Sequence, residues 1–96
     1  MDEQRAAEIQ THLLSRLPDC RISTSYDIER AAQRFQIRHS RIVTHYLYIE
    51  QSAEQFSRDD LMKILESKVV DRLRVTTARA EVRVTAYGVN LRYGTS

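Results

Sequence analysis

The spacing of apolar residues changes once along this chain, and that change constrains the fold more than any other feature. Up to about Leu73, apolar side chains recur every three or four residues, as they do on one face of a helix. Beyond Arg74 they recur at every second residue, which is typical of a strand with one buried face. Because 96 residues support one hydrophobic core, we expect a single small α+β domain over residues 1–96.

Two segments carry the helical spacing. The first runs from Asp2 to Leu17 and is ended by Pro18, which cannot continue a helix. The second begins at Ser57, which forms a capping-box pattern with Asp60. Its apolar residues are Leu61, Ile64, Leu65, Val69 and Leu73. We therefore expect an N-terminal helix and a long helix over about residues 57–73.

The last quarter of the chain alternates between apolar and polar residues on both sides of Gly88. The apolar positions are Val82, Val84 and Ala86 before the glycine, and Val89, Leu91 and Tyr93 after it. Two alternating runs around a glycine predict a C-terminal antiparallel β-hairpin. Residues 75–77 are a candidate for a third short strand.

The segment between the helices supports two interpretations. Thr24 and Asp27 fit the start of a helix that continues to Phe35, with Ile28, Ala31 and Ala32 on its apolar face. Residues 37–50 then form either a second helix or a strand. Six of the eight residues from 42 to 49 are β-branched or aromatic, which favours the strand, but the spacing is compatible with both.

As two helices, residues 25–35 and 39–48, the middle segment resembles the helix-turn-helix of bacterial and phage DNA-binding proteins. The resemblance covers about 20 of the 96 residues. The residues that carry it are the small Ala32 at the helix contact, Phe35 and Ile37 beside the turn, and Ser40 and Ile42 in the second helix. The chain departs from the family pattern at Gln36, where glycine is usual, and at His45, where an apolar residue is usual.

This resemblance implies a small non-enzymatic DNA-binding or regulatory protein that reads duplex DNA. A homodimer is expected, because one such motif reads only a half-site. The side chains that the resemblance places at bases and phosphates are Arg34, Arg38, His39, Ser40, Arg41 and Thr44.

Charge is distributed unevenly along the chain. Residues 31–50 hold three cations and one acid, and residues 74–96 hold four cations and one acid, whereas the rest of the chain is slightly acidic. Arg83 and Arg92 in the tail are therefore further candidates for contact with nucleic acid, either as a wing on the DNA backbone or, with Tyr87 and Tyr93, as an RNA-binding surface.

An alternative function belongs to another class: a protein-interaction or assembly subunit that docks through its β-hairpin or an apolar helix face. The secondary structure of residues 37–50 separates the two hypotheses, because a strand there removes the helix-turn-helix. A β-strand near the end of the sequence also leaves an edge that can pair with a second copy.

Several classes of protein are not expected from the composition. The apolar runs are too short for a membrane-spanning helix or a signal peptide, so we expect a cytoplasmic protein. Cys20 is the single cysteine, and His12, His39 and His45 show no metal-ligand spacing, so neither a metal site nor a cofactor is expected. No nucleophile and base are suitably spaced, so we do not expect an enzyme.

Overall fold

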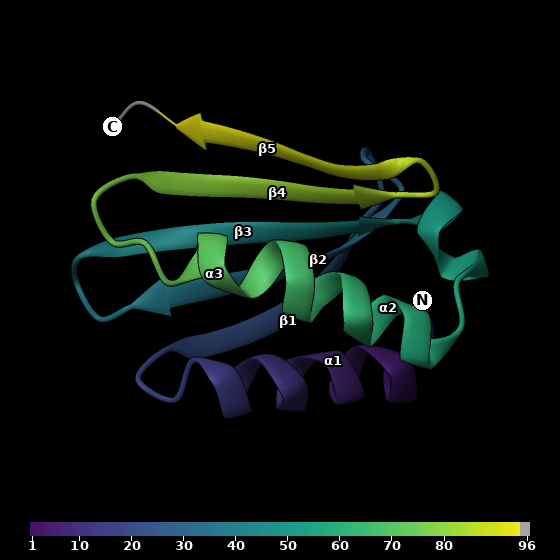
Figure 1. The fold of residues 1–96 in the computed structure, drawn as a ribbon, viewed down its shortest axis with the longest axis horizontal. Coiled ribbons are helices and arrows are strands. Elements are labelled where there is room, and N and C mark those ends of the chain that lie inside the picture. The colour runs from purple at the N-terminus through teal and green to yellow at the C-terminus, as the bar shows by residue number, and fades with distance from the viewer. Residues whose placement is uncertain (95–96) are drawn as a thin grey trace.

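The computed structural model describes residues 1–94 and shows a five-stranded sheet with helices on one side (Figure 1). The helical elements are α1 (Glu3–Arg16), the 3₁₀ helix η1 (Gln51–Gln55), α2 (Arg58–Ile64), the π-helical turn η2 (Leu65–Val69) and α3 (Val70–Leu73). The strands are β1 (Arg21–Asp27), β2 (Ala32–His39), β3 (Val43–Glu50), β4 (Arg79–Thr85) and β5 (Gly88–Gly94).

The sheet is built from two antiparallel units that meet at one parallel pair. Strands β1, β2 and β3 follow one another as a meander, and β4 and β5 form a hairpin. The units join where β3 lies parallel to β4, with Tyr46 opposite Glu81 and Ile49 opposite Val84. The α2–η2–α3 segment makes the crossover between these two strands, as a parallel connection requires.

Helix α1 forms where the sequence predicts it, with Asp2 accepting a hydrogen bond from the Arg5 amide at 2.7 Å as the N-cap. The apolar stripe of α1 packs on the sheet through Ala6, Ile9 and Leu13, which are buried. The chain leaves the helix at Leu17, directly before Pro18.

The second helical segment begins as predicted, because the Ser57 hydroxyl accepts a hydrogen bond from the Asp60 amide at 3.1 Å. It is shorter and less regular than the long helix that the spacing predicts. The segment is a 16-residue helix from α2 to α3, and the π-helical turn η2 interrupts its α-helical hydrogen bonds. Leu65 and Val69 at the two ends of that turn are both buried.

The expected helices of the middle segment are wrong, and with them the helix-turn-helix. Residues 25–48 belong to β1, β2, β3 and the turns between them. Thr24 is not a helix cap: its hydroxyl donates to the Arg34 carbonyl and accepts from the Gln33 amide across the β1–β2 pair. Residues 37–50 are strand apart from the turn at residues 40–42, so the alternative that propensity favoured is the one that forms.

The strands therefore extend far beyond the C-terminal hairpin, and the expected fold class is corrected to α+β with a mixed five-stranded sheet. The hairpin forms, but as one end of that sheet. Residues 75–77 are not a strand and belong to the connection into β4.

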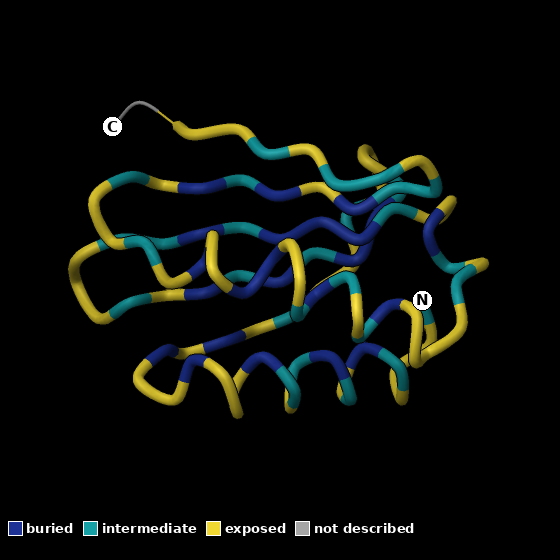
Figure 2. Tube along the Cα trace, viewed as in Figure 1, coloured by how far each residue is buried: buried dark blue, intermediate teal, exposed yellow. Residues whose placement is uncertain are grey.

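The core lies between the helices and one face of the sheet. Its largest fully buried side chains include Phe35, Ile37, Leu47 and Ile49 from the sheet, and Ile9, Leu13, Leu61 and Leu65 from the helices. Figure 2 shows the buried positions concentrated in the central strands and on the inner sides of the helices. Since the helices cover only this face, the other face is left open.

Candidate functional site

One face of the sheet, called here the open sheet face, has no helix covering it. Strand side chains alternate between the two faces, and the buried positions identify the helix side. The open sheet face is formed by Arg21, Ser23, Ser25, Asp27, Ala32, Arg34, Gln36, Arg38, Thr44, Tyr46, Tyr48, Glu50, Arg79, Glu81, Arg83, Thr85, Asn90 and Arg92.

Positive charge is concentrated on this face. Six of its strand positions are arginine, and a seventh arginine, Arg30, reaches over it from the β1–β2 turn, against three carboxylates. Arg30 pairs with Asp27 at 3.2 Å and Glu81 at 3.5 Å, and Arg83 pairs with Glu50. These two arginines therefore occupy all three acids of the open sheet face.

Five arginines remain on this face without a carboxylate partner within residues 1–94. They are Arg21, Arg34, Arg38, Arg79 and Arg92. Their uncompensated charge makes the open sheet face attractive to anions.

Two tyrosines lie at the centre of this face, each beneath an arginine. The rings of Tyr46 and Tyr48 are nearly parallel, with 6.4 Å between centroids. The Arg30 guanidinium lies 4.5 Å from the Tyr48 ring centroid, and the Arg79 guanidinium lies 4.7 Å from the Tyr46 centroid. Cation–π contact holds the guanidiniums over the rings, so the outermost layer here consists of arginine planes.

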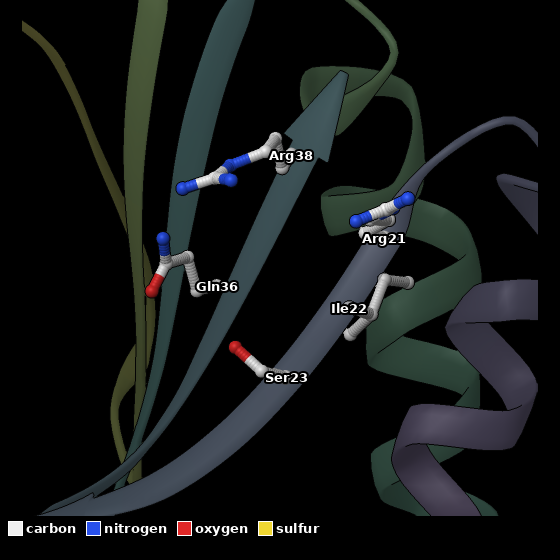
Figure 3. A pocket seen from close by; sticks show the side chains of 5 residues that line it. All are labelled: Arg21, Ile22, Ser23, Gln36 and Arg38. Carbon is white, nitrogen blue, oxygen red and sulfur yellow. The ribbon is translucent and has the colours of Figure 1, made fainter. Parts of the chain in front are cut away.

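A shallow hollow of ≈ 330 Å³ lies at the β1–β2 end of the open sheet face (Figure 3). Arg21 and Arg38 are direct cross-strand partners, and Ser23 and Gln36 are the partners two residues further along. Both arginines are exposed and belong to the unpaired set. Two guanidiniums beside a hydroxyl and an amide provide the donors that a phosphate or carboxylate needs.

The structure brings together five of the eight residues expected to contact nucleic acid. Arg34, Arg38, Thr44, Arg83 and Arg92 lie on the open sheet face. They do so as strand residues, and not on a recognition helix as the resemblance implied.

The other three expected contact residues lie elsewhere. Ser40 and Arg41 are exposed in the β2–β3 turn, where Ser40 has a φ of 49°. His39 points to the helix side: its Nε2 donates to the Leu73 carbonyl at 2.6 Å. That assignment leaves Nδ1 to accept a hydrogen bond from the Cys20 thiol, 3.2 Å away.

His45 holds the same part of the chain to the sheet, through the carbonyl of Val75, two residues after Leu73. The Ala80 amide donates to its Nδ1 at 2.9 Å, so its Nε2 carries the proton and donates to the Val75 carbonyl. The His39 and His45 rings meet edge to face at 5.2 Å. Together these histidines attach α3 and the α3–β4 connection to the sheet, which explains why the polar ring of His45 is fully buried.

Burial shifts the pKa values of two groups in this cluster. Burial lowers the pKa of His45, with a smaller contribution in the same direction from the neighbouring His39, while the hydrogen bond to Val75 opposes both. Burial also raises the pKa of the Cys20 thiol, assisted by the charge of Asp19. Burial thus favours the neutral thiol of Cys20 and the neutral ring of His45, which suits a structural role better than a nucleophilic one.

Sequence reasoning missed two arginines of the open sheet face, Arg21 and Arg30, and it counted Arg79 in the basic tail without choosing it as a contact residue. Arg21 and Arg30 lie in a stretch that reads as acidic when charges are counted by segment. One signal could have identified Arg21. In this edge strand the polar residues Arg21, Ser23 and Ser25 alternate with the apolar Ile22, which points to the other face.

The tail tyrosines do not join the tail arginines on one surface. Tyr93 is the cross-strand partner of Ala80, which is buried on the helix side, so it lies on the face opposite Arg83 and Arg92. Tyr87 is fully exposed in the turn between β4 and β5.

Across residues 1–94, no three His, Cys, Asp or Glu side chains lie close enough together to hold a metal ion. None of the helices in that range has the length and apolar character needed to cross a membrane.

The chain matches no protein-family model, and comparisons with curated proteins and with solved structures give no match either. The helix-turn-helix resemblance therefore has no support from a relative.

Proposed function

We propose that this chain is a small, non-enzymatic cytoplasmic protein that binds single-stranded nucleic acid on its open sheet face. The observation that carries the proposal is the set of five arginines that have no carboxylate partner on that face. A polyanion would supply the missing negative charge, and release of its counterions would drive binding.

The chemistry of the face favours a nucleic acid over an acidic protein. Protein–protein interfaces bury an apolar centre, but the open sheet face carries no large aliphatic side chain. Its two large apolar groups, Tyr46 and Tyr48, are already covered by arginines. Nucleic-acid interfaces are more polar and more positive than protein interfaces, which is the character of this surface.

Its shape favours a single strand over a duplex. Within residues 1–94, no helix lies on the open sheet face where it could enter a major groove. A sheet lets unstacked bases lie on aromatic rings or on guanidinium planes, and here Arg30 and Arg79 present such planes. The Arg21–Arg38 hollow at one end would hold a phosphate of the same strand.

Fluorescence anisotropy with labelled single-stranded RNA, single-stranded DNA and a matched duplex tests this function. We expect binding at low salt that weakens as salt is raised, and tighter binding of the single strands. The double variant Arg21→Ala/Arg38→Ala should reduce the slope of log K against log salt by about 1.4, because two phosphate contacts are lost.

A control for charge alone is the double variant Arg58→Ala/Arg74→Ala. Both arginines form exposed ion pairs on the helices, with Glu8 and Asp71, and their removal changes the net charge equally. Equal weakening by both double variants, or no binding at low salt, would disprove the proposal. Equal competition by poly-glutamate would assign the face to an acidic protein, and stronger binding of the duplex would exclude the single-strand preference.

A further inference from the structure

Strand β5 forms one edge of the sheet, and nothing in residues 1–94 pairs with its outer side (Figure 1). Natural edge strands are usually protected by lysines, prolines, bulges or a covering element. Strand β5 has no lysine or proline, its single charged residue, Arg92, lies on the open sheet face, and the strand stays in register with β4 along its whole length. Its backbone edge is therefore free to accept another strand.

The helix side of β5 is apolar and incompletely covered. Val89, Leu91 and Tyr93 project to this side, and the first two only partly reach the core. Figure 2 shows β5 as the most exposed strand of the sheet, in contrast to the buried central strands. Tyr93 is 48% exposed although it lies on the helix side of the sheet.

A groove of ≈ 420 Å³ runs between β5 and the end of the second helical segment. Val75, Val89 and Leu91 supply its apolar floor, and Lys68, Asp71 and Arg72 supply its polar rim. An apolar floor beside an open strand edge is the arrangement used for binding an added strand.

We propose that two copies of this chain associate through β5, with the strands antiparallel around a two-fold axis at Leu91. In this register Leu91 lies opposite Leu91 of the second copy, and Val89 lies opposite Tyr93 of the second copy. An aromatic and a β-branched residue on the same face form a favourable cross-strand pair. The two-fold axis generates a second, equivalent Val89–Tyr93 pair on the other side of Leu91, as an interface of this symmetry requires.

The strand is complementary to itself on both faces of the sheet. On the helix side, Tyr93 of each copy reaches the groove beside Val89 of the other, and its hydroxyl remains near the polar rim. On the open sheet face, Arg92 lies opposite Asn90 of the other copy, so no two arginines are direct partners across the seam. The dimer would have one continuous sheet of twice the five strands of a single chain.

The other edge strand, β1, does not offer the same surface. Its helix side carries one buried aliphatic residue, Ile22, followed by Thr24 and Tyr26. The amide of Gln10 on α1 already donates to the Ile22 carbonyl at 2.6 Å. Backbone and side chains of β1 are thus engaged with α1, whereas those of β5 are not.

Sedimentation equilibrium of the complete chain, without nucleic acid, tests the association over a micromolar to millimolar series. We expect a mass that approaches twice the 11.2 kDa of one chain. Tyr93→Lys should weaken the association by about tenfold or more, because each copy would place an ammonium group against the apolar groove.

Tyr26→Lys is the matched control, because Tyr26 is 47% exposed and occupies the equivalent side of the other edge strand. It should leave the association unchanged. A second measurement uses Leu91→Cys in a Cys20→Ser background, where mild oxidation should link the two copies, since directly opposed residues lie within disulfide reach. A chain that stays monomeric throughout the series, or equal weakening by both lysine variants, would overturn the proposal.

Discussion

Ala31 holds a backbone conformation that alanine rarely adopts. Its φ is 48° in the turn between β1 and β2, where its carbonyl accepts a hydrogen bond from Gln51. A left-handed residue with a Cβ costs about 1–2 kcal/mol, and glycine avoids that cost at a smaller cost in entropy. We expect Ala31→Gly to raise the free energy of unfolding by about 0.5–1 kcal/mol in urea denaturation.

Ala7→Gly is the control for this prediction. Ala7 is exposed in the interior of α1, where the same substitution should lower the free energy of unfolding by about 1 kcal/mol. Opposite signs for the two variants would identify the backbone conformation as the cause. A loss of stability in Ala31→Gly would contradict the prediction.

His45 should make the stability of the fold depend on pH. Folding lowers its pKa because the ring is buried, so below its ordinary value of about 6.5 the unfolded chain binds a proton more readily than the folded one. The contribution of His45 to the free energy of unfolding is therefore fully present above about pH 6.5. It is lost as the pH falls from that value toward the lower pKa of the folded state.

Thermal unfolding between about pH 7 and pH 5 measures this dependence. The contribution of the ring is isolated by His45→Gln, which should start less stable and show a shallower fall with pH. Imidazole chemical shifts provide a direct readout, and a His45 ring that takes up its proton at or above its ordinary pKa would refute the assignment.

At the scale of elements, the start of the second helical segment depends on one hydroxyl. Ser57 caps the exposed amide of Asp60, and loss of such a cap costs about 1 kcal/mol. We expect Ser57→Ala to lower the free energy of unfolding by that amount. Ser67→Ala should have little effect, because its hydroxyl only donates back to the Lys63 carbonyl on an exposed surface. Equal losses from the two variants would count against the capping role.

The helices of this protein are predictable from its sequence because their ends are marked by residues with a local mechanism. Each of these residues, Asp2, Pro18 and Ser57, starts or ends a helix through backbone groups only a few residues away. The strands of the middle segment are not marked in this way. Gln33 and His45 are buried polar residues at positions where alternation predicts apolar ones, and only their hydrogen-bond partners explain them.

The same segment also contains apolar residues whose spacing fits a helix by coincidence. Ala31, Ala32 and Phe35 would share a helix face, but Ala31 lies in a turn, and Ala32 and Phe35 lie on opposite faces of β2. The apolar pattern alone could not distinguish a helix from a strand here, because short apolar runs fit both the helical and the strand period.

At the scale of the whole molecule, the unpaired arginines should make the fold sensitive to polyvalent anions. A ligand that binds only the folded state stabilises it by mass action, by about 1.4 kcal/mol at ten times its dissociation constant. We expect tripolyphosphate to raise the melting temperature, and this increase to shrink in Arg21→Ala/Arg38→Ala. The Arg58→Ala/Arg74→Ala variant should retain the full increase, and an equal loss in both would exclude the hollow as the binding site.

The charge of the candidate site was partly predictable. Counting by segment identifies residues 31–50 and 74–96 as short of acids, and these stretches contain β2, β3, β4 and β5, which lie side by side. What the count cannot supply is the crossover that places β4 beside β3, since parallel pairing is not visible in local patterns. Nor does the charge count show that Arg30 and Arg83 form ion pairs with all three carboxylates of the open sheet face.

The parallel seam between β3 and β4 has a kinetic consequence. The meander and the hairpin can each close over a short loop, on the microsecond scale typical of hairpins. The seam must instead join Tyr46 to Glu81 across the whole helical crossover, so its loop entropy is paid before its contacts are gained. Docking of the C-terminal hairpin is then the late step of folding. Until that step is complete, the inner edge of β3 and both edges of the hairpin are open to other chains. The time that the chain spends in this partly folded state sets how readily the protein aggregates as it folds.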